Sequence, residues 1–208
     1  MKLAKDGLPT IGGLGFMAFG AWFVSPIITV ILLAPLALAL WFYRDPERTP
    51  LNESENAWVS PADGLVVEVT PNATDPYAGA CTRIGIFMSG LDVHVNRAPV
   101  AGTVEDIRYV PGKKWFAIEP KASENNERLY VGIATAQGRT TFVQIAGIMA
   151  RRIVCYTKKG ETLARGQRYG MIKLGSKVEI YLPLSICPTV SVGDRVKAGE
   201  STIGEIES

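Results

Sequence analysis

The chain has 208 residues, enough for one domain with an appendage, and 22 Lys and Arg against 20 Asp and Glu leave a formal charge of +2. This near balance, without a dense stripe of basic residues, argues against a nucleic-acid partner. One histidine and three scattered cysteines without a C-x-x-C spacing argue against a metal centre and indicate reduced thiols.

The first 44 residues form an apolar segment, because no charged side chain occurs between Asp6 and Arg44. A bilayer core needs about 20 apolar residues as a helix, so the run is too long for one upright span and short for two. We therefore expect a membrane anchor over residues 1–44, either one tilted helix kinked at Pro26 or a helical hairpin that turns at Ser25-Pro26. Basic residues flank both ends, and a hairpin follows if both flanks stay at the cytoplasmic face of the cell membrane. A buried hairpin in a soluble core is the alternative.

The rest of the chain reads as a linker followed by short strands. Residues 45–57 are polar and contain proline, and residues 58–208 alternate in short apolar runs separated by Gly, Pro, Asn and Asp. This pattern predicts a mainly β domain, an antiparallel sandwich or barrel. The expected strands cover residues 64–70, 82–88, 102–110, 128–135, 140–147, 151–157, 170–182 and a last run near 201–207.

A weak internal repeat refines this fold prediction. The segments GETLARGQRYGMI (160–172) and GDRVKAGESTIGEI (193–206) share the spacing G-[ED]-x-[LV]-x-x-G. Such glycine-punctuated strands resemble the half-barrels of biotinyl and lipoyl carriers, so we expect barrel-sandwich-like half-barrels. Lys197 does not match the carrier lysine, and a non-enzymatic binding module of this fold remains one alternative.

Three segments carry residues suited to chemistry, namely an acid at Asp63, an imidazole at His94 and a hydroxyl at Ser176. Each has an ordinary reading as a turn, a core histidine or a bulge; together they suggest a membrane-bound serine hydrolase, which is a second alternative. No G-x-S-x-G elbow is present, however. Gly175 has no side chain to hinder its carbonyl, so the Ser176 hydroxyl can approach the peptide bond that precedes it. The sequence therefore indicates the Gly175–Ser176 bond itself as the target.

Five motifs in order, FYRDPER, PADG, DVHVNRAP, QIAGIMARRI and GMIKLGSKV, resemble the phosphatidylserine decarboxylases in their short microbial form. The resemblance covers about residues 40 to 190. It implies that Ser176 attacks the Gly175 carbonyl and that a proenzyme splits into a β subunit (1–175) and an α subunit (176–208). Ser176 would become a pyruvoyl group, a covalent pyruvate cofactor. Phosphatidylserine in the membrane would form a Schiff base with it and be converted to phosphatidylethanolamine and CO₂.

The resemblance also implies roles for single residues. His94 would protonate the substrate carbon after CO₂ leaves, because it is the side chain that titrates near neutral pH. Asp63 would activate Ser176 or orient His94. Many longer relatives carry H-x-x-H, whereas this chain has Arg97 at the second position.

Arginine suits a lipid phosphate, and the candidates for that group are Arg151, Arg152 and Arg97. The first two are adjacent on a strand pattern and so face opposite ways. The oligomeric state stays open, with a homo-oligomer among the states considered.

Overall fold

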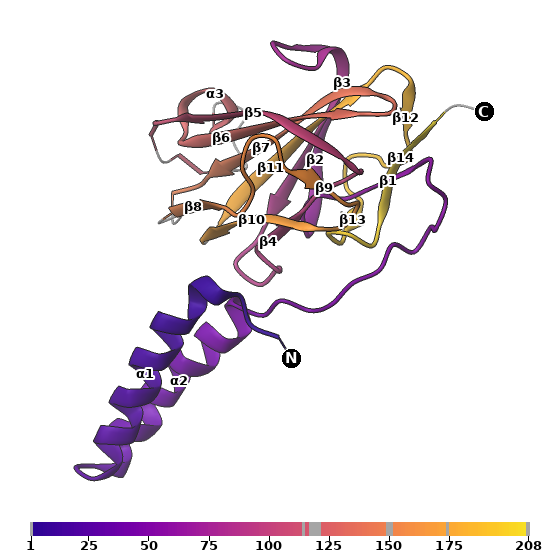
Figure 1. The fold of residues 1–208 in the computed structure, drawn as a ribbon. Coiled ribbons are helices and arrows are strands. Elements are labelled where there is room, and N and C mark those ends of the chain that lie inside the picture. Colours follow the sequence, from indigo (N-terminus) through magenta and orange to yellow (C-terminus); the bar gives the residue numbers. More distant parts are fainter. Residues whose placement is uncertain (1, 114, 117–121, 149–151, 174, 207–208) are drawn as a thin grey trace. The chain divides into compact units, whose positions relative to one another are not determined.

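The computed structural model describes residues 2–113, 115–116, 122–148, 152–173 and 175–206. They form two compact units, residues 1–47 and residues 48–208, named here the helical unit and the β unit. The boundary falls inside the segment predicted as a linker, and an irregular stretch leads from the helices to the first strand (Figure 1).

The helical unit is a hairpin of two helices. A short 3₁₀ turn (η1, Lys5–Gly7) precedes α1 (Leu8–Trp22), and α2 spans Pro26–Phe42. Of the two predicted arrangements, the structure has the hairpin and not one kinked helix. Pro26 explains the turn, because proline cannot donate to the preceding helix but fits the first turn of a new one.

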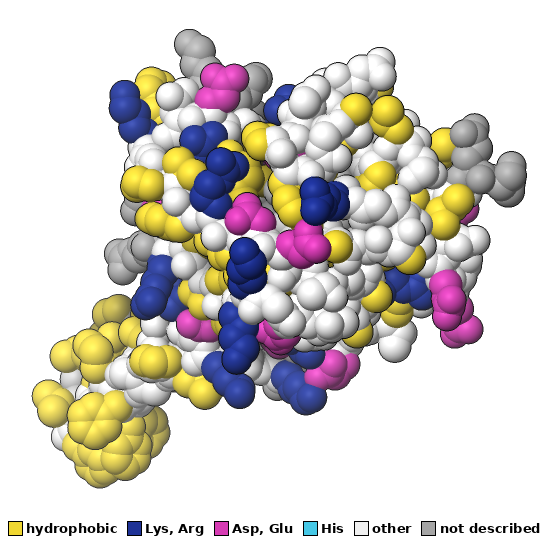
Figure 2. All heavy atoms as spheres, turned by 45° about the horizontal axis from the view of Figure 1, so that its top comes forward, with side chains coloured by type: hydrophobic (Ala, Val, Ile, Leu, Met, Phe, Trp, Pro, Cys, Tyr) yellow, Lys and Arg dark blue, Asp and Glu magenta, His cyan; other side chains and the backbone are white. Residues whose placement is uncertain are grey.

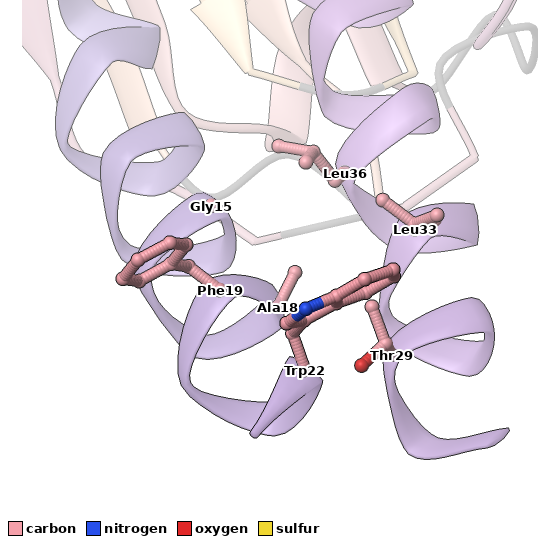
Figure 3. A pocket seen from close by; sticks show the side chains of 7 residues that line it. All are labelled: Gly15, Ala18, Phe19, Trp22, Thr29, Leu33 and Leu36. Atoms are coloured by element: carbon pink, nitrogen blue, oxygen red, sulfur yellow. The ribbon is translucent and has the colours of Figure 1, made fainter. Parts of the chain in front are cut away.

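Large apolar side chains cover the outside of this hairpin, and Figure 2 shows them as a nearly continuous hydrophobic surface. Phe19 and Trp22 of α1 and Leu33 and Leu36 of α2 line an apolar cavity of about 370 Å³ between the helices (Figure 3). Within the described residues, neither helix combines the length and hydropathy needed to cross a bilayer.

The β unit consists of fourteen described strands and one short helix, α3 (Ala122–Asn125). The strands are β1 (Ala57–Val59), β2 (Gly64–Asp75), β3 (Gly79–Met88), β4 (Val95–Arg97), β5 (Gly102–Val110), β6 (Arg128–Thr135), β7 (Gly138–Ala146), β8 (Arg152–Cys155), β9 (Thr162–Leu163), β10 (Arg168–Lys173), β11 (Ser176–Pro183), β12 (Ile186–Pro188), β13 (Arg195–Val196) and β14 (Thr202–Ile206).

These strands form three antiparallel sheets. The largest has the order β13-β2-β3-β11-β7-β6-β5-β9, and two smaller ones have the orders β4-β10-β8 and β1-β14-β12. Buried apolar residues from all three sheets meet in one core. The predicted mainly β fold with antiparallel half-barrels is confirmed.

The large sheet has an internal two-fold pattern. From either edge toward the centre, a two-residue strand is followed by a long strand that begins with a glycine. Both long strands carry a bulge at the same place, after Val66 in β2 and after Val104 in β5. The edge strands β9 and β13 come from the two segments of the predicted repeat, so the repeat corresponds to matching halves of the sheet.

The prediction of one continuous strand over residues 170–182 is wrong. The segment contains two strands in different sheets: β10 pairs with β4 and β8, and β11 pairs with β3 and β7. Gly175 lies between them with φ +46°. This left-handed conformation cannot continue a strand, and glycine is the residue that adopts it without a steric cost.

Candidate functional site

Ser176 is the first residue of β11 and lies at the centre of the large sheet. It pairs with Met88 of β3 on one side and Ala146 of β7 on the other. Its side chain shares the core face of β11 with Val178 and Ile180, because alternate residues of a strand face the same way. The side chain is fully buried, and its Oγ has no hydrogen-bond partner among the described residues. A buried hydroxyl without a partner is costly and requires an explanation.

The carbonyl of Gly175 already accepts a hydrogen bond from a backbone amide. The Gly147 N–H lies 3.0 Å from this oxygen. Attack by the Ser176 hydroxyl would place negative charge on the same oxygen, where a fixed N–H donor is most effective. Gly147 was not predicted from the sequence, because the contact depends on how the end of β7 lies beside Gly175.

His94 is fully buried immediately before β4. The Ile172 amide donates to its backbone carbonyl at 3.3 Å, which places His94 beside the end of β10, close in sequence to Ser176. Its Nδ1 lies 2.9 Å from the Asp92 carbonyl oxygen. Because a carbonyl only accepts, Nδ1 carries the hydrogen, and Nε2 is the basic nitrogen of the neutral ring.

Two buried amide side chains lie near the same end of the sheets. Gln144 Nε2 donates to Asn96 Oδ1 at 2.8 Å, and Asn96 Nδ2 lies 3.5 Å from the Met88 sulfur. Gln144 stands two residues before Ala146 on β7 and is therefore a diagonal neighbour of Ser176 on the core face. Sequence reasoning missed both amides, since a lone Asn or Gln in a strand pattern carries no distinctive signal.

Asp63 lies immediately before β2, and its carboxylate already has hydrogen-bond partners. Arg48 holds it with two nitrogens, one of them 2.8 Å from Oδ2, and the Ala198 amide donates to Oδ1 at 2.8 Å. The backbones of β2 and β11 are separated by β3, a spacing of about 10 Å over two strand intervals. The predicted contact of Asp63 with Ser176 is therefore not formed in this structure, and its role in cleavage stays a prediction.

The two-fold pattern shows that the sheet itself does not require Asp63. The residue at the matching position before β5 is Ala101, which precedes Gly102 as Asp63 precedes Gly64. A carboxylate present in only one half is a feature of this site and not of the fold.

Replacing Asp63 by Asn is expected to lower the free energy of unfolding by about 3 kcal/mol, because it breaks a buried ion pair with Arg48. Urea unfolding measures this loss, and the half-buried Asp106→Asn of the matching strand is the control. Electrophoresis of the folded variant then separates two roles. An uncut folded variant assigns Asp63 to the cleavage chemistry, and a fully cut one confines it to the ion pair.

The three arginine candidates differ in position. Arg97 is buried and donates to the Gly166 carbonyl at 2.9 Å. Arg152 is exposed on β8 and pairs in register with Lys173, the last residue of β10. Arg151 lies outside the described residues. In the part of the chain that the structure describes, no three His, Cys, Asp or Glu side chains are grouped to hold a metal ion.

A buried hydroxyl that directly follows a hydrogen-bonded glycine carbonyl is the arrangement that attack on this peptide bond would require. The family model described as phosphatidylserine decarboxylase matches residues 36–204. The chain belongs to the phosphatidylserine decarboxylase family.

Curated relatives match over nearly the whole chain, and each is called a phosphatidylserine decarboxylase proenzyme. The protein of Nitratidesulfovibrio vulgaris is 47% identical over 98% of this chain and 94% of its own length. That of Solidesulfovibrio magneticus is 45% identical over 98% and 95%, and that of Ralstonia nicotianae is 44% identical over 99% and 96%.

Proposed function

We propose that this chain is a proenzyme that cuts itself between Gly175 and Ser176 and then converts phosphatidylserine to phosphatidylethanolamine and CO₂. The names of the relatives support the reaction and the precursor state. The single observation that carries the site is the buried Ser176 hydroxyl, which follows a carbonyl already hydrogen-bonded to Gly147.

Self-cleavage begins with attack of the Ser176 oxygen on the Gly175 carbonyl carbon. The carbon–nitrogen bond between the two residues breaks, and the hydroxyl proton ends on the nitrogen, which leaves an ester. Removal of the proton on Cα of Ser176 then breaks its Cβ–Oγ bond, so Gly175 keeps a carboxylate and position 176 becomes a dehydroalanine. Addition of water and loss of ammonia leave a ketone at the new N-terminus. The Gly147 amide stabilises the oxyanion of the first step.

The residues present fit a pyruvoyl group at position 176. When formed, the group supplies an electron sink for the carbanion left by CO₂, a role that pyridoxal phosphate has in other enzymes. The group would have apolar neighbours on both sides, since Met88 and Ala146 are fully buried. His94 Nε2, once it has taken up a proton, delivers it to the carbon that CO₂ leaves, with the ring held at Nδ1 by the Asp92 carbonyl.

Arg152 is the best placed of the candidates for the lipid phosphate. It is exposed, and its register with Lys173 puts two positive charges at the end of β10, two residues before Gly175 in the sequence. Arg97 is less suited, because it is buried and already donates to Gly166.

A membrane location at the cytoplasmic face of the cell membrane is part of the proposal. The exposed apolar surface of the hairpin supports it, since soluble monomers rarely expose large contiguous apolar patches. Within the β unit, Trp115 and Phe116 are exposed on a loop that Asn126 ties to the Ala146 carbonyl, beside Ser176. Exposed aromatic residues at the site are typical of a contact with the membrane interface.

The test is the mass of the freshly purified wild-type chain under denaturing conditions. We expect two fragments in place of one 22.5 kDa polypeptide, 1–175 and 176–208, the second lighter by one ammonia than its encoded sequence. Borohydride should add two hydrogens to the second fragment, and the cut protein should release CO₂ from phosphatidylserine.

The same measurement distinguishes the alternatives. A serine hydrolase would stay intact and react with a fluorophosphonate at Ser176. A binding module would stay intact and react with neither reagent. An active, uncut chain without a ketone contradicts the proposal.

A further inference from the structure

A buried lysine directly follows the proposed cleavage site. The Lys177 side chain is only 3% exposed, although lysine is among the residues least often buried. Successive residues of a strand face opposite ways, so Lys177 points away from the core face that carries Ser176. The proposed function does not use it.

Three side chains hold the Lys177 ammonium. Its Nζ lies 2.9 Å from Glu68 Oε2, 2.8 Å from Glu179 Oε1 and 3.1 Å from Ser123 Oγ. Ser123 in turn donates to Glu179 at 2.6 Å. Glu68 comes from β2, Ser123 from α3 and Glu179 from β11 itself. This group, named here the Lys177 cluster, therefore ties the start of β11 to two other elements, β2 and α3.

The neighbouring strand leaves room for this side chain. Gly85 of β3 pairs with both Glu68 and Glu179, and a Cβ on Gly85 would lie 2.6 Å from Cε of Lys177. Burial works to raise the pKa of Glu68, but the hydrogen bond and charge of Lys177, together with Thr70 and Arg83, outweigh it and keep that pKa below its usual value. Glu68 is therefore ionised at neutral pH.

The matching half of the sheet shows that the fold does not need this cluster. In one half of the sheet, Lys177 pairs with Phe87, and Phe87 pairs with Leu65, the second residue of β2. In the other half, Arg139 pairs with Ala134, and Ala134 pairs with Thr103, the second residue of β5. The counterpart of Lys177 is thus Arg139, and its side chain is 62% exposed. The same sheet position tolerates a solvent-exposed cation.

We infer that Lys177 is a positioning residue, which holds the new N-terminus of the α subunit so that the ketone at position 176 stays on the core face. This inference rests on the proposed function. Before cleavage, the bond to Gly175 holds Ser176 from the other side. After cleavage, that bond and the backbone nitrogen at position 176 are gone, and Lys177 is the first complete residue of the strand.

A strand end that has lost a backbone bond frays unless side chains hold it. The Lys177 cluster supplies that restraint from the face opposite the reacting group, and therefore without occupying the space of the substrate. Misplacement of a reacting group by about 1 Å is enough to cost as much as a hundredfold in rate.

The test compares Lys177→Met with its matched control Arg139→Met in the full chain. Phosphatidylserine in detergent micelles is the substrate, and kcat is expressed per ketone, counted by mass after borohydride reduction. We expect K177M to be cut to the wild-type extent, with kcat per ketone about tenfold lower and KM within about twofold. R139M should match the wild type in all three quantities. A purely structural role would lower the yield of folded, cut protein and leave kcat per ketone unchanged.

A second pair of variants keeps every charge. Gly85→Ala places a methyl group against the end of Lys177, whereas Gly132→Ala, at the matching position, places it against the Tyr77 ring. G85A is expected to show the same loss in kcat per ketone as K177M, and G132A is expected to show none. If K177M does not fold, the glycine pair provides the test of the proposal instead. Equal kcat per ketone within both pairs overturns the role of Lys177 and leaves self-cleavage intact. An uncut wild-type chain overturns the proposed function instead.

Discussion

Ser176→Ala is expected to remain one polypeptide of 22.5 kDa, without a ketone and with decarboxylation at least about a thousandfold below wild type. The variant lacks the atom that attacks Gly175 and also the precursor of the reactive group. It should fold at least as stably as the uncut wild-type chain, since the Ser176 Oγ is buried without a described partner and its removal relieves that cost. Electrophoresis and intact mass measure the cut, and CO₂ release measures the activity.

Ser185→Ala is the matched control, because Ser185 is exposed just beyond the far end of β11. It should be cut and active like the wild type. A Ser176→Ala variant that is cut at position 176, or that is uncut but active, would contradict the proposed mechanism at its first step.

His94→Asn is expected to produce normally cut protein with a ketone, but with kcat about 10²–10⁴-fold lower, the range typical of a lost general acid. Asparagine is the informative replacement, since its amide N–H can keep the hydrogen bond that Nδ1 makes to the Asp92 carbonyl. What disappears is Nε2, the nitrogen proposed to deliver the proton. The measurement is single-turnover decarboxylation in cut protein, with the ketone counted separately.

The separation of the two activities is the critical result for His94. If the variant stays uncut, the imidazole acts in cleavage, and one histidine then has both tasks, because Arg97 stands where longer relatives have a second histidine. Cut protein with wild-type kcat would remove His94 from the chemistry altogether.

Much of the fold could be predicted from alternation alone. The expected strands at 102–110 and 128–135 agree with β5 and β6, because alternating apolar residues bounded by Gly or Arg leave one register for burial. The break at Gly175 could not be predicted in this way. Alternation continues on both sides of it, and only the backbone torsion shows that the chain passes from one sheet to another.

The sequence predicted the parts of the candidate site that depend on the type of side chain. It did not predict the parts that depend on which residues the fold brings together. Ser176 and Gly175 are recognisable as a hydroxyl beside an unhindered carbonyl. The amide of Gly147 has no sequence signal, since any residue carries an N–H. Lys177 resembles a surface lysine until Gly85, 92 positions away in sequence, is seen to make room for it. Asp63 was predicted as a site residue from its carboxylate, but its ion pair with Arg48 could not be predicted from the sequence.

The central place of β11 has a consequence for the lifetime of the mature protein. This strand lies between β3 and β7, and the proposed 176–208 piece also supplies β12, β13 and β14, which pair with one another or with strands of the larger piece. Once the chain is cut, heat releases two separate polypeptides whose reunion is second-order and slow on dilution, whereas the precursor refolds as one chain. Activation is therefore a step that each molecule takes once, after folding, and thermal inactivation of the cut form should become harder to reverse as the protein is diluted.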